Sequence, residues 1–154
     1  MPEVSVIMAV HNGLPYLTQA IDSILAQTLT GFEFIIVNDA STDGTRQAIE
    51  AYDDSRIRLI NLSQNGGQTA ALNHGLRLAT APFIARQDAD DCSKPERLET
   101  QVKFFKANPD YLLTGTAADL IDDKNRISSV SVHPTSDEAV RATFAEGYNC
   151  FYHG

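Results

Sequence analysis

The chain has 154 residues, a length that suits one domain with a sizeable hydrophobic core. Its 20 acidic residues exceed its 12 lysines and arginines, and the resulting formal charge of −8 argues against a surface that binds nucleic acid or anionic membranes. The cysteines, Cys92 and Cys150, form no CxxC pair or disulfide framework, so we expect a reducing, cytoplasmic setting. No apolar window is long enough for a membrane span, and the N-terminus lacks the organisation of a signal peptide.

The first half of the chain alternates between apolar runs and helical patterns. The runs with the composition of buried strands span residues 4–10, 32–37, 56–62 and 82–87. Apolar residues recur at helical spacing between these runs, over residues 17–27, 45–52 and 68–79. This alternation predicts an α/β fold in which helices cover a mostly parallel sheet.

The second half is expected to contain further helices and strands. Ser93 stands three residues before Glu96, which predicts a capping box at the start of a helix that ends near residue 108. Beyond it we expect a buried strand over residues 111–116 and a hairpin whose turn, residues 122–125, leads into residues 126–132. Ser136 is expected to cap a last short helix.

Polar segments follow three of the predicted strands. They are His11-Asn12, Asn38-Asp39 and the acidic tetrapeptide Asp88-Ala89-Asp90-Asp91. Right-handed crossovers bring the loops after parallel strands to one edge of the sheet, so we expect these segments to meet in one crevice. Open α/β sheets bind their ligands at this edge.

The tetrapeptide crowds carboxylates at the end of a strand. Two unit charges ~4 Å apart repel by about 4 kcal/mol at an effective dielectric of roughly 20. A divalent cation that carries a phosphate ligand would remove this repulsion, because hard cations share carboxylate and phosphate oxygens. The alternative that needs no ligand is an acidic turn solvated at the surface. Cys92 is rejected as a nucleophile, since the neighbouring carboxylates disfavour its thiolate.

Two further segments are candidates for ligand contacts. Asp39 can accept a hydrogen bond from a base imide or a ribose hydroxyl, or it can cap the following helix, a role that Ser41 or Asp43 could also fill. The segment 65–67 contains two glycines before a helix and could present N–H groups to an anion, or be only a flexible loop. Asn73 is a polar residue within that otherwise apolar helix.

Taken together, these segments resemble the family 2 glycosyltransferases, which have the GT-A fold. The matching stretches are residues 4–12, 23–28, 34–44, 65–75, 88–91 and 95–101. The resemblance rests on their shared order and spacing, and it spans nearly the whole chain.

The resemblance implies a site for a nucleoside-diphosphate sugar, with uridine expected as the nucleoside. Asp39 would hold the edge of uracil or thymine, and the end of the first strand around Ala9 and His11 would line the base. The residues assigned to nucleotide binding are Ala9, His11, Asp39, Asn65, Gly67, Asn73 and Asp88.

The acidic tetrapeptide, as a DXD motif, would then hold the metal. Asp88 would contact the ribose or metal-bound water, Asp90 would ligate Mn²⁺ or Mg²⁺ on the diphosphate, and Asp91 would face the sugar. The metal would stabilise the leaving group while an acceptor hydroxyl displaces it with inversion. The implied enzyme is hexosyltransferase-like, with a role in polysaccharide biosynthesis.

The chain departs from the family pattern in two ways. The family often has an aromatic residue at His11 and a proline near Ala9, so stacking on the base is expected to be weaker. The family's general base is a carboxylate downstream of the acidic cluster, and the acids there lack its motif context: Asp119, Asp122, Asp123, Asp137 and Glu138. We therefore expect residues 1–154 to form a donor-binding domain without its acceptor-side segment, one that binds donor but transfers poorly or not at all.

The sequence was also compared with two other classes of enzyme and with one non-catalytic function. A dehydrogenase loop would need G-x-G-x-x-G after the first strand, where only Gly13 stands, and a phosphohydrolase would need an aspartate where Val10-His11 stands. A non-catalytic nucleotide-sugar-binding or scaffold domain is the alternative function. The acceptor, whether glycan, lipid or protein, and the donor sugar are not set by the sequence. Surface left by a missing segment could drive formation of a homodimer, and a parent protein peripheral to the inner membrane is compatible with the chain.

Overall fold

The computed structural model describes residues 1–122, 126–131 and 134–146. The chain divides into two compact units, Met1–Asn108 and a second that begins at Pro109. Of the helices in the described ranges, none has the length and apolar character needed to cross a bilayer.

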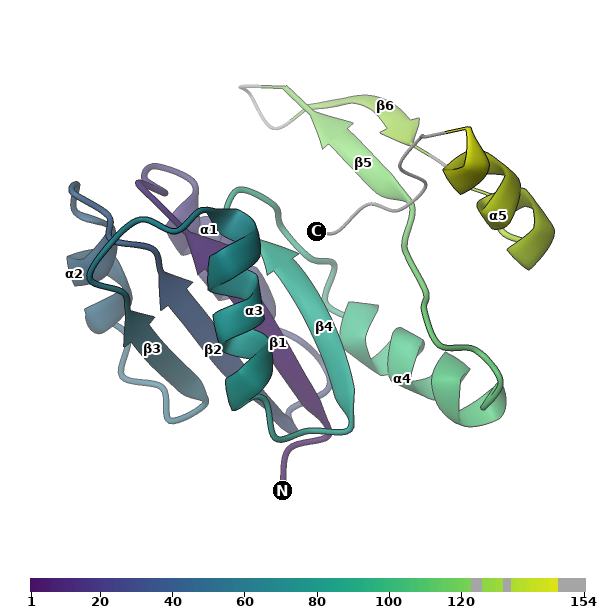
Figure 1. Cartoon of the computed structure of the whole chain (residues 1–154), viewed down its shortest axis with the longest axis horizontal. Helices are drawn as coiled ribbons and strands as arrows, with labels where there is room; N and C mark the ends of the chain where they lie inside the picture. Colours follow the sequence, from purple (N-terminus) through teal and green to yellow (C-terminus); the bar gives the residue numbers. More distant parts are fainter. Residues whose placement is uncertain (123–125, 132–133, 147–154) are drawn as a thin grey trace. The chain divides into compact units, whose positions relative to one another are not determined.

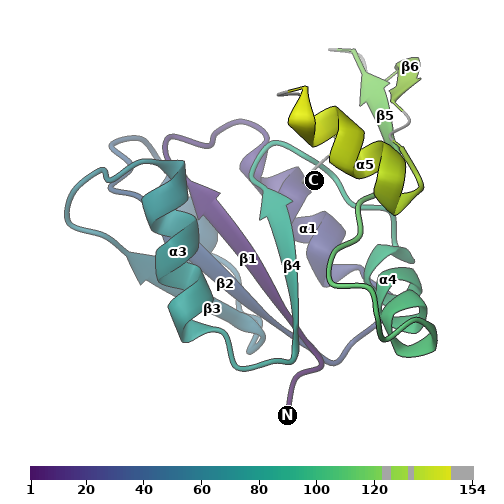
Figure 2. The same cartoon turned by 45° about the vertical axis from the view of Figure 1, so that its right-hand side comes forward.

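The first unit is built on a four-stranded parallel sheet with the strand order β3-β2-β1-β4. Its strands are β1 (Val4–Val10), β2 (Phe32–Asn38), β3 (Ile57–Asn61) and β4 (Phe83–Asp88). Its helices are α1 (Leu17–Leu25), α2 (Thr45–Glu50), α3 (Gln68–Leu78) and α4 (Arg97–Ala107). Figures 1 and 2 show α3 on one face of the sheet and α1 and α2 on the other. This is the α/β fold that the alternating pattern predicts.

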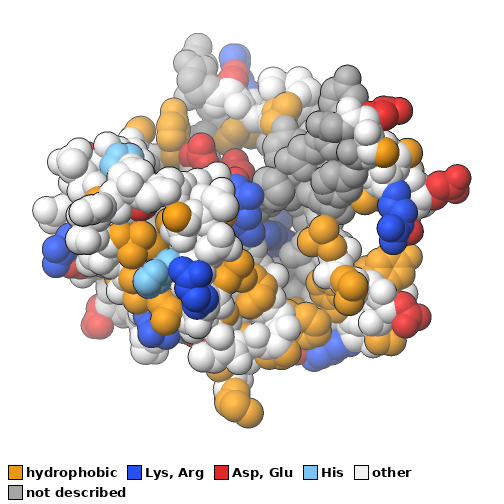
Figure 3. All heavy atoms as spheres, viewed as in Figure 1, with side chains coloured by type: hydrophobic (Ala, Val, Ile, Leu, Met, Phe, Trp, Pro, Cys, Tyr) orange, Lys and Arg blue, Asp and Glu red, His pale blue; other side chains and the backbone are white. Residues whose placement is uncertain are grey.

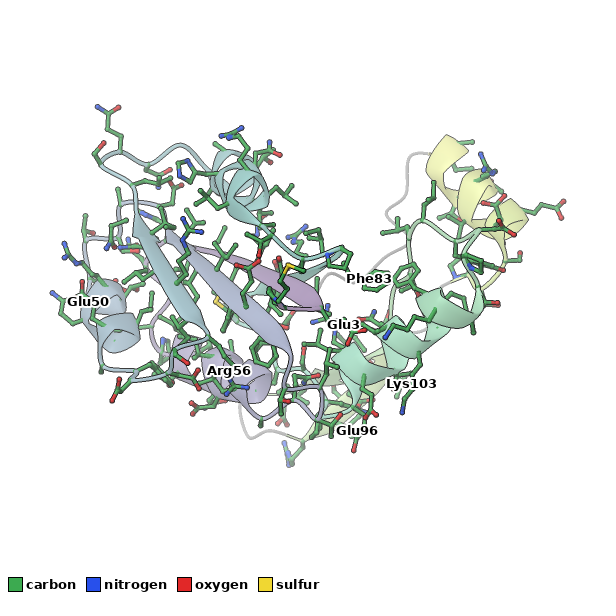
Figure 4. All side chains as sticks on the ribbon, turned by 90° about the horizontal axis from the view of Figure 1, so that it is seen from below. Glu3, Glu50, Arg56, Phe83, Glu96 and Lys103 are labelled. Carbon is green, nitrogen blue, oxygen red and sulfur yellow. The ribbon has the colours of Figure 1, made fainter. Side chains whose placement is uncertain are left out.

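The core lies mainly between the sheet and α1. Helix α1 buries a stripe at helical spacing against one face of the sheet, and α2 and α4 complete that layer. The buried residues of the stripe are Leu17, Ala20, Ile21 and Ile24. At the edge of β4, Phe83 stacks on Phe105 of α4 with ring centroids 5.5 Å apart; Figure 4 labels Phe83.

Helix α3 packs unusually close to the opposite face of the sheet. A Cβ atom at Gly75 would lie 2.6 Å from Cγ2 of Ile7 and 3.3 Å from Cγ2 of Val37. Ala71, one turn earlier, is also buried against the sheet. Small side chains on this face of α3 therefore let its backbone approach β1 and β2.

The register of the sheet aligns the carboxyl ends of β1, β2 and β4. Ala9 is paired with Val37 on one side and with Asp88 on the other, and Val10 is paired with Asn38. The loops that follow β1, β2 and β4 consequently leave the sheet at the same edge. The structure confirms this central expectation from the sequence.

The second unit contains a hairpin and a helix. Strands β5 (Ala118–Ile121) and β6 (Ile127–Ser131) pair antiparallel, and Asp122 N–H donates to Arg126 O at 3.0 Å beside the turn. Ser136 Oγ accepts from Ala139 N–H at 3.2 Å at the start of α5 (Asp137–Ala145). Both predicted features are confirmed, while residues 123–125 and 132 of the hairpin, and Asp123 as a candidate base, lie outside the described residues.

The predicted capping box is wrong. Helix α4 begins at Arg97, and Ser93 lies before it. The Ser93 hydroxyl donates to Gln87 Oε1 at 2.7 Å and accepts from Arg97 Nη1 at 2.8 Å. The Ser93 hydroxyl is engaged by the buried Gln87 amide and the partly buried Arg97 guanidinium, so it does not cap the helix.

The predicted buried strand over residues 111–116 is also wrong. Residues 111–115 have no regular structure, and Leu112 is 95% exposed. An apolar run becomes a strand only where another strand accepts its backbone hydrogen bonds. In the described part of the chain, no strand pairs with these residues.

Candidate functional site

A cleft of about 590 Å³ opens at the carboxyl ends of β1, β2 and β4. Residues from the loops after these strands and from the start of α3 line it. In the view of Figure 3, acidic and basic side chains lie next to one another beside the end of β4. The polar segments that the sequence placed in one crevice therefore share one cleft.

The loops after β1 and β2 are fastened to each other. Asn12 N–H donates to Ser41 Oγ at 2.9 Å, and Asn12 Oδ1 accepts from Thr42 N–H at 2.8 Å. Among the described residues, the non-glycine positions with positive φ are Asn12 (54°) and Ala40 (55°), one in each loop. Alanine rarely adopts this conformation, so the loops hold a strained backbone at the cleft.

The ring of His11 is oriented by the backbone of the second loop. Its Nδ1 lies 2.7 Å from the carbonyl oxygen of Asp39. A carbonyl can only accept, so Nδ1 carries the proton and donates. In the neutral ring Nε2 is then an acceptor, and Asn12 Nδ2 lies 3.3 Å from it.

The carboxylate of Asp39 binds the loop before α3. It accepts from Gly66 N–H at 2.9 Å and from Gly67 N–H at 2.8 Å, one bond to each oxygen. Asp39 is only 2% exposed. Gly67 has φ +84° and ψ 160°, a conformation that is essentially restricted to glycine.

These bonds correct one sequence-based hypothesis and argue against a second. The N–H groups of the glycine pair do not face an external anion, because Asp39 already supplies the negative charge. Asp39 is also not the cap of α2. The N-cap of α2 is Gly44, and the carboxylate that bonds the start of this helix is that of Asp43, whose Oδ1 accepts from Thr45 N–H at 2.9 Å.

The acidic tetrapeptide is held by an ion pair. Arg86 contacts both oxygens of Asp88: Nη2 lies 2.8 Å from Oδ1 and 3.2 Å from Oδ2, and Nε lies 3.0 Å from Oδ1. Asp90 is exposed at the cleft. Burial, followed by the charges of Asp90 and Asp88, raises the pKa of Asp91. The neighbouring carboxylates act in the same direction as burial, while the charges of Arg97 and Arg86 oppose them.

The thiol of Cys92 has an environment that disfavours ionisation. Burial, and then the charge of Asp91, raises its pKa. A nucleophilic cysteine needs the opposite shift. The rejection of this residue as a nucleophile is supported.

Most of the predicted site residues meet in the cleft. Those that line it are Ala9, His11, Asp39, Asn65, Gly67, Asp88 and Asp90. Within the described part of the chain, Asp91 lies outside this lining and Asn73 lies exposed on α3, also outside it. Tyr16, just before α1, lines the cleft as well, and the sequence analysis did not select it.

The sequence analysis also missed a buried polar group beneath the tetrapeptide. Gln87 donates to the backbone of the tetrapeptide, and Arg97 donates to Gln87. A signal for Gln87 was present, because strand alternation puts it on the same face as Phe83 and Ala85, which pack in the core. A polar residue at such a position requires an explanation.

Carboxylate oxygens are suitable ligands for a hard divalent cation, but the described residues bring few of them together at this site. The described residues contain no group of three or more histidine, cysteine or acidic side chains placed to hold a metal. Both oxygens of Asp88 are engaged by Arg86, while Asp90 is exposed at the cleft. Mg²⁺ commonly binds one or two carboxylates together with substrate phosphates. The site therefore fits a metal that completes its coordination with a diphosphate.

The parallel sheet, its helical layers and the cleft at its strand ends are similar to those of solved glycosyltransferases with the GT-A fold. The chain belongs to Glycosyl transferase family 2, whose family model matches residues 5–152.

Named relatives agree with this assignment. The chain is 43% identical over 140 residues to the putative glycosyltransferase EpsE of Bacillus subtilis (strain 168), which covers 89% of this chain and 50% of the relative. The chain thus spans about half the length of this curated relative. Its homologues are named glycosyltransferases.

Solved structures show the same fold. The crystal structure of S. aureus TarS 1-349 in complex with UDP-GlcNAc has a TM-score of 0.65 and 27% identity, over 79% of this chain and 40% of that one. The mannosyltransferase PcManGT from Pyrobaculum calidifontis, in complex with GDP-Man and Mn²⁺, has a TM-score of 0.64 and 30% identity, over 80% and 37%.

Proposed function

We propose that this chain forms the donor-binding part of an inverting glycosyltransferase that takes a sugar from a nucleoside-diphosphate sugar, with UDP as the expected nucleotide. The observation that carries the proposal is the cleft that gathers His11, Asp39, Asp88 and Asp90 at the ends of parallel strands. Solved relatives hold UDP-GlcNAc or GDP-Man, which supports a nucleotide sugar as the ligand.

The loops after β1 and β2 would bind the nucleoside. Each Asp39 oxygen accepts one backbone N–H and keeps a lone pair, so the carboxylate can accept again from a base imide. His11 and Ala9 line the cleft beside it, and Tyr16 adds an aromatic surface there. The hydrogen bonds within these loops hold the acceptors in place before the nucleotide arrives.

The tetrapeptide would bind the diphosphate through a metal. Asp90 is the ligand we assign, and Asp88, fixed by Arg86, would contact the ribose or metal-bound water. When bound, Mn²⁺ or Mg²⁺ supplies positive charge to the departing diphosphate. The contribution of the chain is to present carboxylates at a fixed position on the floor of the cleft.

A second candidate function is nucleotide-sugar binding without transfer. Two of the downstream acids considered as general bases are engaged in ion pairs, Asp122 with Arg126 at 2.6 Å and Asp137 with Arg141 at 2.6 Å. A carboxylate oxygen that accepts from a guanidinium has fewer lone pairs left to accept the proton of an acceptor hydroxyl. This observation favours donor binding over efficient transfer by the chain alone.

Calorimetric titration of UDP into the chain tests the proposal. We expect binding in Mn²⁺ that is lost in EDTA and lost in Asp90→Ala. The matched control is Asp53→Ala, which removes an exposed carboxylate between α2 and β3, and it should bind as the wild type does. Binding that is unaffected by EDTA and by Asp90→Ala would contradict the assigned metal ligand, and absence of binding would contradict the proposed function.

A further inference from the structure

The acidic tetrapeptide rests on a buried amide. Gln87 is fully buried, and its Nε2 donates to Asp88 O at 3.1 Å and to Asp91 O at 2.7 Å. These carbonyls belong to the first and last residues of the tetrapeptide. One amide group therefore ties the two ends of the acidic turn together from the core side.

The orientation of that amide is fixed by donors on its other side. Gln87 Oε1 accepts from Ser93 Oγ at 2.7 Å and from Arg97 Nη1 at 2.8 Å. A flipped amide would turn its NH₂ group toward the guanidinium, which can only donate. Arg97 Nη2 also donates to Arg86 O at 2.8 Å, which anchors the guanidinium to β4.

The network has a cost that an apolar core would not have. Burial lowers the pKa of Arg97, while the charges of Asp91 and Asp88 act to raise it. Its Nε is a buried nitrogen without a hydrogen-bond partner among the described residues. Buried charges and unpaired donors destabilise a fold, so a network that contains both calls for a reason beyond packing.

We propose that Gln87 and Arg97 are positioning residues for the donor site: Gln87 holds the acidic turn in the shape that presents Asp88 and Asp90 to the cleft, and Arg97 holds Gln87. This inference rests on the proposed function and deepens it. A turn that is already fixed needs no reorganisation when the metal and diphosphate bind, which is how supporting residues strengthen a site.

A matched pair of substitutions separates positioning from stability. Gln27 is a second buried glutamine, 4% exposed, whose Nε2 donates to Ser23 O at 3.1 Å and Lys94 O at 2.8 Å and whose Oε1 accepts from Leu98 N–H at 2.9 Å. Its partners in the described part of the chain lie outside the tetrapeptide. Gln87→Met and Gln27→Met should lower the melting temperature to a similar extent, since each removes the amide of one buried glutamine.

The two variants should differ in donor binding. We expect Gln87→Met to weaken the binding of UDP in Mn²⁺ by about tenfold or more, the usual effect of losing a supporting residue. Gln27→Met should bind UDP as the wild type does. Equal losses in the two variants, or full affinity in Gln87→Met, would overturn the proposal.

A nucleotide-free measurement distinguishes failure of this inference from failure of the proposed function. In ¹⁵N-labelled chain without UDP, Gln87→Met should shift the backbone amide signals of residues 89–91, and Gln27→Met should leave them in place. If wild-type chain binds no UDP, the proposed function fails while these signals still decide whether Gln87 sets the turn. If Gln87→Met does not fold, Ser93→Ala should shift the same signals less strongly, and unchanged signals in that folded variant would overturn the positioning role.

Discussion

Replacing Asp39 by asparagine tests the bond between the loop after β2 and the loop before α3. Each Asp39 oxygen accepts a backbone N–H, at 2.9 Å from Gly66 and 2.8 Å from Gly67. Asparagine keeps one oxygen and replaces the other with an NH₂ group. This NH₂ group would face a backbone N–H, so that two donors would meet without an acceptor. Gly67 N–H has a second acceptor in Asn65 Oδ1 at 3.0 Å, so we expect the amide oxygen to turn toward Gly66.

The size of the effect follows from these contacts. A hydrogen bond to a charged group contributes about 1.5–3 kcal/mol and a neutral one about 1 kcal/mol. Two charge-assisted bonds become one neutral bond and one donor–donor contact at a residue that is only 2% exposed. The second acceptor of Gly67 reduces the loss, so we expect a destabilisation of about 2 kcal/mol, or a fall in melting temperature of roughly 4–8 °C.

Thermal unfolding followed by circular dichroism measures this effect. The matched control is Asp43→Asn in the same loop, where an exposed carboxylate accepts from Thr45 N–H and asparagine caps almost as well as aspartate. Asp43→Asn should melt near the wild type. If Asp39→Asn has the same melting temperature as Asp43→Asn, the reasoning that Asp39 holds the two loops together is refuted.

Three further substitutions test other parts of the account. Gly75→Ala should destabilise the chain by about 1–3 kcal/mol in urea unfolding, because its Cβ would lie 2.6 Å from β1; unchanged stability would show that α3 can move away. Burial raises the pKa of Glu33, but hydrogen bonds from Ser5 and Thr80 outweigh it and leave the pKa below 4.5. Folding therefore favours the charged form of Glu33. The stability that this carboxylate contributes is present above pH 4.5 and is lost as the pH falls through the lowered pKa. Glu33→Gln should therefore melt below the wild type at neutral pH and converge with it in acid, and a constant difference would exclude this linkage. Arg86→Met should raise the affinity for Mn²⁺ alone by about tenfold, or 1.4 kcal/mol, measured by electron paramagnetic resonance, because it frees the paired carboxylate; an unchanged affinity would mean that the ion pair does not compete with the metal.

The features that sequence predicted well depend on periodicity and chain direction. The apolar run at 4–10 has the composition expected of a strand buried on both faces, and parallel crossovers then predict that His11, Asp39 and Asp88 share one edge. These inferences need no knowledge of individual contacts. The position of the cleft could therefore be predicted before its geometry was known.

The features that sequence missed depend on partners distant along the chain. A local capping rule assigned Ser93 to a helix end, but Gln87 and Arg97 took its hydroxyl. The glycine pair before α3 has the composition of an anion-binding loop, and only the fold shows that Asp39 is already its anion. Composition indicates which groups can bond, whereas the tertiary structure decides which partner each one finds.

The central claim is that the cleft binds a nucleotide through a metal, and mapping the binding of UDP on the ¹⁵N-labelled chain tests it most directly. We predict that UDP with Mg²⁺ shifts the backbone amide signals of residues 9–12, 39–40 and 88–91, and that EDTA returns them to their free positions. Shifts confined to other parts of the chain, or the absence of any shift at saturating UDP, would contradict the account.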